Sequence, residues 1–340
     1  HYDDFHSVVE NPAVRSLGNI PTYFVDMELF STDRAKGMYR PLLLTTFALN
    51  YAMGEYEVWG YLLVNLLIHL GCSVLVARIG GLLIGQSAAV LCGLLFAVHP
   101  ICTEPVNYVS SRSESLAALL YLGSFCYFVV HRDSGRVGGH WKGVVSCMLG
   151  LLAKSTVATL PAVLLAYDLW QRKLRSERIL WRPFLKLHAP YWAALGLHLS
   201  VLWFSGFLPK SFDVPVRSGF TQMWTQLKAI PYYLQLLFVP NRLNVEHQFF
   251  ESDSWQETEV LLGLFLVVGL VVLAANWRNR LPLSFFALWN LVVLLPASVM
   301  PLNMLVNERR LYLVVAGFVW IVAHALSRMP KSIAIALLFL

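Results

Sequence analysis

Charged residues are scarce in this sequence. Asp, Glu, Lys and Arg make up only 14% of its 340 residues, whereas soluble globular domains carry about 25%. Hydrophobic residues make up 57%, and the mean hydropathy is +0.59. The apolar residues occur in blocks of about 17 to 25, the length that crosses a bilayer core of roughly 30 Å. The composition excludes an ordinary soluble protein and predicts an all-α polytopic membrane protein.

Cysteine is also rare, and its placement is uninformative. There are five cysteines. Four of them, Cys72, Cys92, Cys126 and Cys147, lie within apolar stretches, and only Cys102 lies in a polar segment. This spacing indicates neither a disulfide framework nor a cysteine-based metal site.

The apolar blocks predict where the chain crosses the membrane. The predicted spans are 57–77, 81–98, 115–130, 143–169 as a folded-back pair, 187–207, 259–276, 282–299 and 311–326. We expect residues 1–340 to form a single transmembrane domain, with a further span before residue 1 and a truncation at the C-terminus.

The distribution of positive charge predicts the orientation. Alternate connections collect 14 of the 26 basic residues, and such loops stay on the cytoplasmic side. The opposite, external side then receives loop 1–56 and loop 208–258. In the second loop, Trp224, Tyr232 and Tyr233 favour a helix near 220–239 at the membrane interface. The positive charges lie in short clusters, which favours contact with membrane lipids and argues against a nucleic-acid partner.

Four basic residues do not follow this distribution. Arg112, Lys154, Arg309 and Arg310 fall on the external side or within an apolar stretch. An ionisable group at membrane depth costs at least about 2.5 kcal/mol and usually faces a cavity or a partner. Together they favour an anionic ligand. The competing interpretation is an internal ion pair with one of the glutamates Glu104, Glu114 or Glu308.

Segment 143–169 has a basic residue at its centre. Both of its ends lie on the cytoplasmic side, so each arm is too short to span and needs protein or a water-filled cavity around it. Lys154 sits at the bend. This arrangement predicts a polar pocket that is open to the external side. The alternative is a kinked helix pair whose lysine bonds the backbone carbonyls freed at the bend.

External motifs supply the candidate catalytic groups. Asp3 and Asp4 are adjacent carboxylates, which suit a general base or a metal ligand. A helix cap or solvated turn is the alternative. His99, Glu104 and Glu114 lie around prolines in the next external turn, and their spacing favours hydrogen-bonded positioning over a zinc site.

A third motif runs from Asn307 to Tyr312. Its arginines Arg309 and Arg310 could hold a phosphate through paired N–H donors. An ion pair with Glu308 competes with that assignment.

These motifs occur in an order that resembles a known family. The matching runs are Asp3-Asp4 with Asn11, Tyr39-Arg40-Pro41-Leu42 with Asn50-Tyr51, Asn65 to His69, His99-Pro100 with Thr103-Glu104, Arg112 with Glu114, Lys154, and Glu308-Arg309 with Leu311-Tyr312. They resemble the membrane part of the transmembrane and tetratricopeptide-repeat O-mannosyltransferases and their bacterial relatives, and the match covers nearly the whole chain.

The resemblance implies a GT-C-type helical bundle with an external or lumenal active site. It implies transfer of a sugar such as mannose from a polyprenyl or dolichyl phosphate to a protein hydroxyl, with inversion, and tetratricopeptide repeats outside this chain. Residues 102–112 are closer to the bacterial members, which favours a bacterial inner membrane over the endoplasmic reticulum.

The same resemblance assigns roles to residues. Asp3 or Asp4 would act as the base, with a divalent metal there as an alternative. The lipid phosphate would be held by Lys154, Arg309, Arg310 and Arg112. Acceptor and sugar would be positioned by His99, Glu104, Glu114, Tyr39, Arg40, Glu308 and Tyr312.

Two other classes of function stay open. A transporter or flippase for lipid-linked saccharides would also need buried cations and a broken helix pair. The absence of a clear internal repeat argues against it. A non-catalytic membrane scaffold would be signalled by loss of the Asp pair, and both aspartates are present.

Overall fold

The chain is mainly helical in the part that its computed structural model describes, which comprises residues 4–33, 37–134, 137–208, 216–241, 243–275, 282–301 and 303–330. No β-strand occurs among these residues. The chain forms two compact units. Unit 1 comprises His1–Cys72, Thr103–Leu164 and Leu180–Pro215, and unit 2 comprises Ser73–Cys102, Leu165–Ile179 and Val216–Leu340.

Within these described residues, five helices are long and apolar enough to cross a membrane. They are α3 (Val58–Leu83), α6 (Arg112–Ser134), α12 (Thr258–Ala275), α13 (Pro282–Val299) and the segment Glu308–Leu326, which ends in α14 (Tyr312–Leu326). A sixth is added if α4 (Gln86–Val98) and the bent segment Pro100–Asn107 count as one span. The predicted all-α polytopic class is confirmed.

The other predicted spans are also helical. Segment 187–207 corresponds to α9 (Trp181–Phe204), and segment 143–169 corresponds to α7 (Val137–Ala153) and α8 (Leu160–Leu174). These helices are not among the five above. The predicted break at Lys154 is confirmed, because α7 ends at Ala153 and a 3₁₀ turn, η7 (Ser155–Thr159), follows with Lys154 extended at its N-cap.

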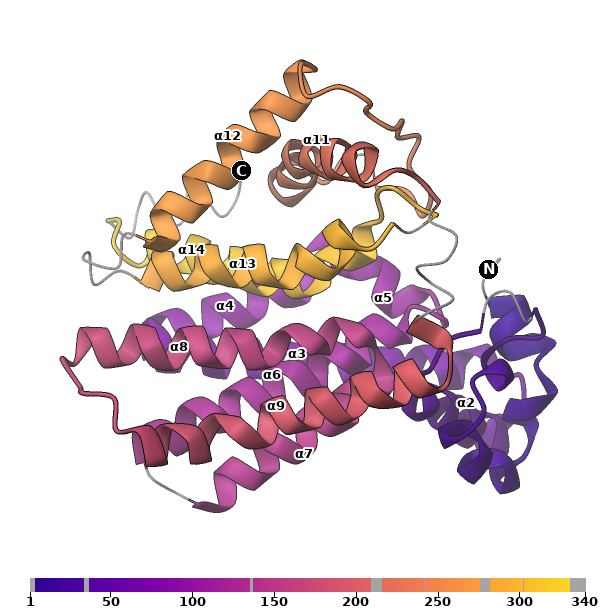
Figure 1. Cartoon of the computed structure of the whole chain (residues 1–340). Coiled ribbons are helices and arrows are strands. Elements are labelled where there is room, and N and C mark those ends of the chain that lie inside the picture. Colours follow the sequence, from indigo (N-terminus) through magenta and orange to yellow (C-terminus); the bar gives the residue numbers. More distant parts are fainter. Residues whose placement is uncertain are drawn as a thin grey trace. The chain divides into compact units, whose positions relative to one another are not determined.

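Unit 1 is built on a tight antiparallel pair of helices. α6 and α7 lie side by side, with α9 next to α7 (Figure 1). The hydroxyls of Ser124 and Ser146 donate to the carbonyls of Gly143 and Leu120 across the helix pair, at 2.7 and 2.9 Å. Small residues and hydroxyl bonds of this kind let helix backbones approach closely in a membrane.

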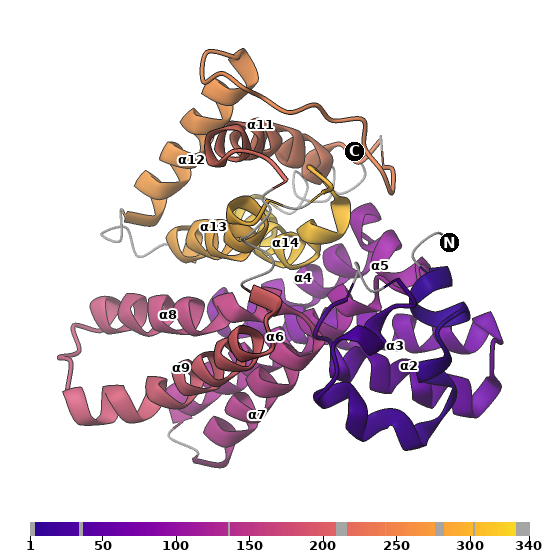
Figure 2. The same ribbon diagram turned by 45° about the vertical axis from the view of Figure 1, so that its right-hand side comes forward.

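In its described residues, 4–33 and 37–56, the predicted external loop 1–56 is a folded segment around a helix that the sequence did not indicate. Figure 2 shows this helix, α2 (Pro41–Gly54), packed against the preceding 3₁₀ turns, which include η2 (Pro12–Arg15) and η3 (Leu17–Phe24). Pro41 at the first helical position suits a helix start. Val14, Tyr23 and Phe47 are fully buried in the resulting core, so this segment has a hydrophobic core of its own.

Unit 2 contains α11 (Gly219–Phe238), α12, α13 and α14. Trp289 of α13 and Trp320 of α14 meet edge to face with ring centroids 5.0 Å apart, and each donates its indole N–H to a backbone carbonyl at 3.0 Å. The helix predicted near 220–239 is α11. It packs closely on α12 at Gly263, where an added Cβ would overlap the Leu227 carbonyl oxygen.

The close approach at Gly263 predicts a localised packing defect. Gly263→Ala should push α11 and α12 apart and lower the thermal midpoint in detergent, since overpacking typically costs about 1–3 kcal/mol. Gly269→Ala on the same helix is the matched control, because nothing lies within 4 Å of its added Cβ. An unchanged midpoint for Gly263→Ala would contradict the described contact between α11 and α12.

Candidate functional site

The turn that begins α6, residues 110–114, collects several predicted site residues of unit 1. The Ser110 backbone N–H donates to Asp4 Oδ1 at 2.8 Å, and the Ser111 hydroxyl donates to Glu104 Oε1 at 3.4 Å. Asp4 and Glu104 are both buried. Acidic groups near a helix N-terminus are stabilised by its exposed N–H groups and dipole. Asp3 lies outside the described residues.

Arg112 is completely buried and extensively hydrogen-bonded. Its Nε donates to Asn65 Oδ1 and one terminal nitrogen donates to Asn50 Oδ1, both at 2.6 Å. The other terminal nitrogen donates to the Tyr61 carbonyl at 3.0 Å. The guanidinium also lies 5.0 Å from the centroid of the Phe47 ring, within cation–π range. This geometry favours a structural role, joining α2, α3 and α6, over the predicted contact with a lipid phosphate.

Lys154 forms an ion pair with Glu114. The lysine side chain keeps 19% of its surface exposed, whereas that of Glu114 keeps 7%. The pair joins the first turn of α6 to the break between α7 and η7. Lys154 therefore has an internal acidic partner, Glu114, as the competing interpretation of the sequence expected. Its ammonium group stays partly accessible.

Tyr39 and Arg40 precede α2. The Tyr39 hydroxyl donates to the Phe24 carbonyl at 3.2 Å, and its ring lies 6.0 Å from that of His198 in α9. Burial raises the pKa of Tyr39, so the phenol stays protonated and able to donate. The Arg40 guanidinium lies 5.4 Å from the centroid of the Phe30 ring. Both side chains stabilise the folded segment before α2.

His99 belongs to unit 2 and follows α4. Its Nδ1 accepts from the Ile101 N–H at 3.3 Å, so Nε2 carries the proton and donates to the Leu237 carbonyl at 3.2 Å. A ring with one nitrogen accepting and the other donating is the neutral tautomer. His99 therefore fixes the turn after α4 to the end of α11.

Glu308 lies in the 3₁₀ turn η8 (Glu308–Leu311), which is capped by Asn307. Its Oε1 accepts from the Asn244 N–H and lies 2.9 Å from His247 Nε2, while His247 Nδ1 accepts from the Tyr232 hydroxyl at 2.6 Å. Burial lowers the pKa of His247, which keeps the imidazole neutral and able to accept from Tyr232. Glu308 is thus anchored to Asn244 and His247, which follow α11.

The two arginines of η8 have different surroundings. Arg310 donates to the carbonyls of Met304 at 2.6 Å and Leu305 at 3.0 Å. The Arg309 guanidinium lies 3.8 Å from the Met304 sulfur. The backbone N–H of Arg309 donates to Asn307 Oδ1 at 2.9 Å. Both arginines are half-buried. Arg310 has no acidic partner within the described part of the chain.

Tyr312 follows these arginines as the first residue of α14. It is buried, with its ring edge to face against Phe96 and the centroids 5.2 Å apart. This contact packs the start of α14 on α4 within unit 2. Tyr312 therefore supports the turn that carries Arg309 and Arg310.

Several residues that organise these groups were not predicted as site residues. Asn65 accepts from Arg112 and donates its amide to the Val106 and Tyr108 carbonyls at 3.2 and 3.3 Å. His247 and Tyr232 anchor Glu308. Asn65 lies in one of the family-like runs, which was an available signal, whereas no sequence pattern singles out His247.

The predicted alternative of a metal at the Asp pair depends partly on Asp3, which is not described. Among the described residues, no group of three His, Cys, Asp or Glu side chains is placed to hold a metal ion.

The contacts of Arg112 predict a stability defect rather than a ligand-binding defect. Arg112→Met should lower stability by about 3 kcal/mol, because buried carbonyl and amide oxygens lose their donor. Thermal unfolding in detergent measures this, with exposed Arg15→Met of the same unit as the control. A variant with a wild-type melting temperature but lost affinity for polyprenyl phosphate would contradict the structural role.

Comparisons with known proteins give a consistent set of relatives. The human protein O-mannosyl-transferase TMTC2 is 32% identical over 271 residues, which cover 73% of this chain and 30% of the relative. Human TMTC3 is 33% identical over 127 residues, 36% of this chain and 14% of the relative. The protein O-mannosyl-transferase F38B6.6 of Caenorhabditis elegans is 26% identical over 343 residues, 93% of this chain and 47% of the relative.

The chain spans about half, or less, of the length of these relatives. No family model matches the chain, and no solved structure gives a significant match. The resemblance deduced from the sequence motifs is nevertheless confirmed by the relatives. The chain is a multi-pass membrane protein homologous to the TMTC family of protein O-mannosyl-transferases.

Proposed function

We propose that this chain is the membrane part of a glycosyltransferase that moves a sugar from a polyprenyl or dolichyl phosphate to a hydroxyl of a protein. The names of its relatives support a protein acceptor and mannose as the sugar. The predicted external segments, 1–56 and 208–258, would lie on the side of the membrane where the reaction takes place. The sequence-based preference for a bacterial inner membrane remains a prediction.

The observation that carries this proposal is the environment of Arg310. Its guanidinium is half-buried and bonded to two neutral carbonyl oxygens, which orient the group without cancelling its charge. Arginine has five N–H donors, and a phosphate can accept two of them in parallel. A charge held in this way in a membrane protein is a suitable partner for an anionic phosphate.

The leaving group explains why cations would accelerate the reaction. As the bond between the anomeric carbon and the phosphate oxygen breaks, the electron pair stays on that oxygen and the lipid phosphate gains negative charge. Preplaced donors stabilise this charge more in the transition state than in the bound donor. We assign Arg309 and Arg310 to this role in unit 2, and Lys154 in unit 1.

Asp4 is our candidate for the base. The acceptor hydroxyl would lose its proton to the carboxylate as its oxygen attacks the anomeric carbon. A single displacement of this kind inverts the anomeric configuration. The Ser110 N–H bond to Oδ1 would hold the carboxylate in a fixed orientation, as general-base catalysis requires. Asp3 is the alternative base, and the other alternative is a divalent metal bound by the pair.

The remaining predicted residues would position substrates or their neighbours. Glu104 shares the 110–114 turn with Asp4, which supports a role near the acceptor. Glu114 would set the position of the Lys154 ammonium. We assign Glu308 and Tyr312 to holding the backbone around η8, and His99 to fixing the turn after α4 to the end of α11. Tyr39 and Arg40 would hold the segment before α2.

The experiment uses the full-length parent protein in nanodiscs with polyprenyl-phosphate mannose and a Ser/Thr-containing acceptor peptide, and it measures release of lipid phosphate. Asp4→Asn keeps an oxygen for the Ser110 N–H but removes the base, so kcat should fall at least about 100-fold. For Lys154→Gln, kcat should fall by a similar factor, because the developing charge on the phosphate loses a cation.

Matched controls are available in unit 1. Asp26 is exposed and also accepts a backbone N–H through Oδ1, from Glu28 at 2.9 Å, so Asp26→Asn should retain activity. Lys142 is exposed on α7 and provides Lys142→Gln. Movement of intact lipid-linked sugar across the bilayer without phosphate release would favour the transporter. Binding of the lipid-linked sugar with neither phosphate release nor movement across the bilayer would favour the non-catalytic scaffold.

A further inference from the structure

One face of α11 is devoted to holding backbone groups of another segment. Gln222, Gln226, Ala229 and Tyr233 are buried and recur at helical spacing, so they form one stripe along the helix. Three of them hydrogen-bond to the backbone between residues 298 and 307. Ala229, between them on the stripe, is fully buried. α11 therefore holds backbone groups of Ser298, Met300, Leu305 and Asn307, which lead into η8.

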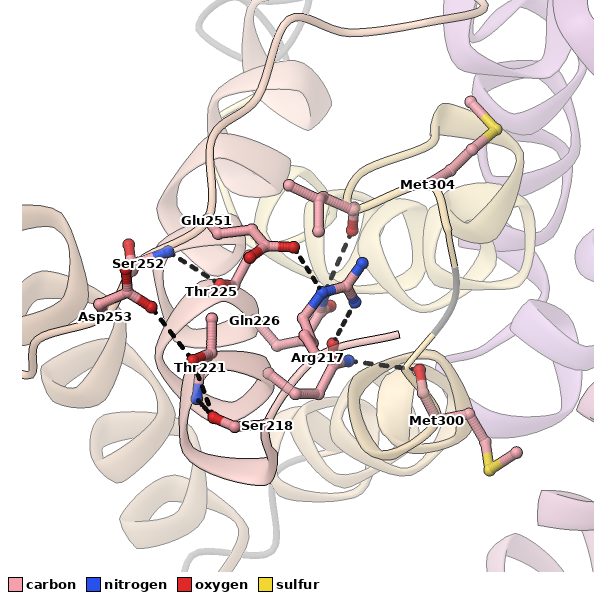
Figure 3. A network of polar contacts seen from close by, with 12 residues as sticks. Arg217, Ser218, Thr221, Thr225, Gln226, Glu251, Ser252, Asp253, Met300 and Met304 are labelled. Atoms are coloured by element: carbon pink, nitrogen blue, oxygen red, sulfur yellow. Dashed lines mark hydrogen bonds and ion pairs between the residues drawn. The ribbon is translucent and has the colours of Figure 1, made fainter. Parts of the chain in front are cut away.

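The first contact lies at the end of α13. The Gln222 amide donates to the carbonyls of Ser298 at 3.0 Å and Met300 at 3.3 Å, which belong to the groups a helix leaves unpaired at its C-terminus. Its Oε1 accepts from Arg217 at 2.6 Å, and Arg217 Nε donates to Glu251 at 2.9 Å (Figure 3). Gln222 is thus held in place from both ends.

An adjacent face of α11 is fixed to the loop that follows it and leads to α12. Thr225 accepts the Ser252 N–H at 2.9 Å, and the Thr221 hydroxyl donates to Asp253 at 3.1 Å (Figure 3). Ser252 in turn donates to Glu257 at 2.7 Å. These bonds restrain rotation of α11 about its axis, so the stripe keeps its direction toward residues 298–307.

The decisive contact is a shared carbonyl. Gln226 Nε2 donates to the Leu305 oxygen at 3.1 Å, and Arg310 donates to the same oxygen at 3.0 Å. A carbonyl oxygen has two lone pairs and can accept both donors. Gln226 is buried, so water cannot readily replace its amide. Further along, the Tyr233 hydroxyl accepts the Asn307 N–H at 3.4 Å.

We propose that Gln226 is a positioning residue for a phosphate-binding Arg310, acting through the Leu305 carbonyl. This inference rests on the proposed function for the identity of the ligand, and on the hydrogen bonds above for the positioning. The amide fixes the oxygen on which the guanidinium is oriented, so the cation is held in place before the phosphate binds. Preorganisation of this kind reduces the entropic cost of ordering the arginine side chain when the phosphate binds.

The test compares Gln226→Met with Gln235→Met in the full-length protein. Methionine keeps the length of the side chain and removes the amide donor. Gln235 lies on the same helix and is exposed. Hydrogen exchange of peptides covering residues 303–310 reports on positioning. Binding of a short polyprenyl phosphate, with polyprenol and inorganic phosphate as comparison probes, reports on the ligand, and Arg310→Gln is the reference for its loss.

We expect Gln226→Met to accelerate exchange in 303–310 and to weaken polyprenyl phosphate binding about tenfold, equivalent to 1.4 kcal/mol. Polyprenol binding should be unchanged, and KM for the lipid-linked donor should rise more than kcat falls. A purely structural role would lower the melting temperature while the folded protein kept its affinity, and that result would overturn the proposal.

Three further outcomes separate the positioning role of Gln226 from the assignment of a lipid phosphate as the ligand. Unchanged exchange in Gln226→Met would overturn the positioning role, even if Arg310→Gln loses binding and the proposed function stands. Faster exchange with wild-type lipid phosphate binding in both Gln226→Met and Arg310→Gln would overturn the phosphate assignment. Equal binding of inorganic phosphate and polyprenyl phosphate would overturn a lipid carrier as the ligand of this turn.

Discussion

Unit 1 depends on how it accommodates one fully buried arginine. Charge in a membrane protein is tolerated where it is hydrogen-bonded within the protein, and Arg112 meets this condition through Asn50, Asn65 and the Tyr61 carbonyl. These partners tie α2 and α3 to the start of α6. The same turn contains Glu114 and binds Asp4 through the Ser110 N–H, so its geometry and that of the candidate catalytic groups are set together.

The basic residues that depart from the expected distribution thus fall into two kinds. Arg112 has its donors directed to protein oxygens and serves the fold. Lys154 keeps some exposure beside Glu114, and Arg310 keeps a charge that its carbonyl partners do not neutralise. The distinction follows from the hydrogen-bond partners of each group, and the electrostatic part of the proposed chemistry rests on the second kind.

Local sequence features predicted the helical class, the positions of most helices and the break at Lys154, because block length, bounding charge and a polar centre are all visible in a short window. The helix α2 was missed, since an apolar stretch too short to span was assigned to a loop. The partners of Arg112 were also beyond prediction. Asn65 and Asn50 lie 47 and 62 positions away, and Gln226 lies 79 positions from Leu305, so these pairings depend on packing.

The central claim is that this protein couples cleavage of a lipid-phosphate sugar to glycosylation of a protein hydroxyl. The most direct measurement incubates the full-length protein in nanodiscs with anomerically defined polyprenyl-phosphate mannose and a Ser/Thr peptide, and follows both products by mass spectrometry and NMR. The account predicts one glycosylated hydroxyl for each lipid phosphate released, with inverted anomeric configuration. Retained configuration would contradict the single displacement, and lipid-linked sugar that stays intact with every acceptor would contradict the transferase itself.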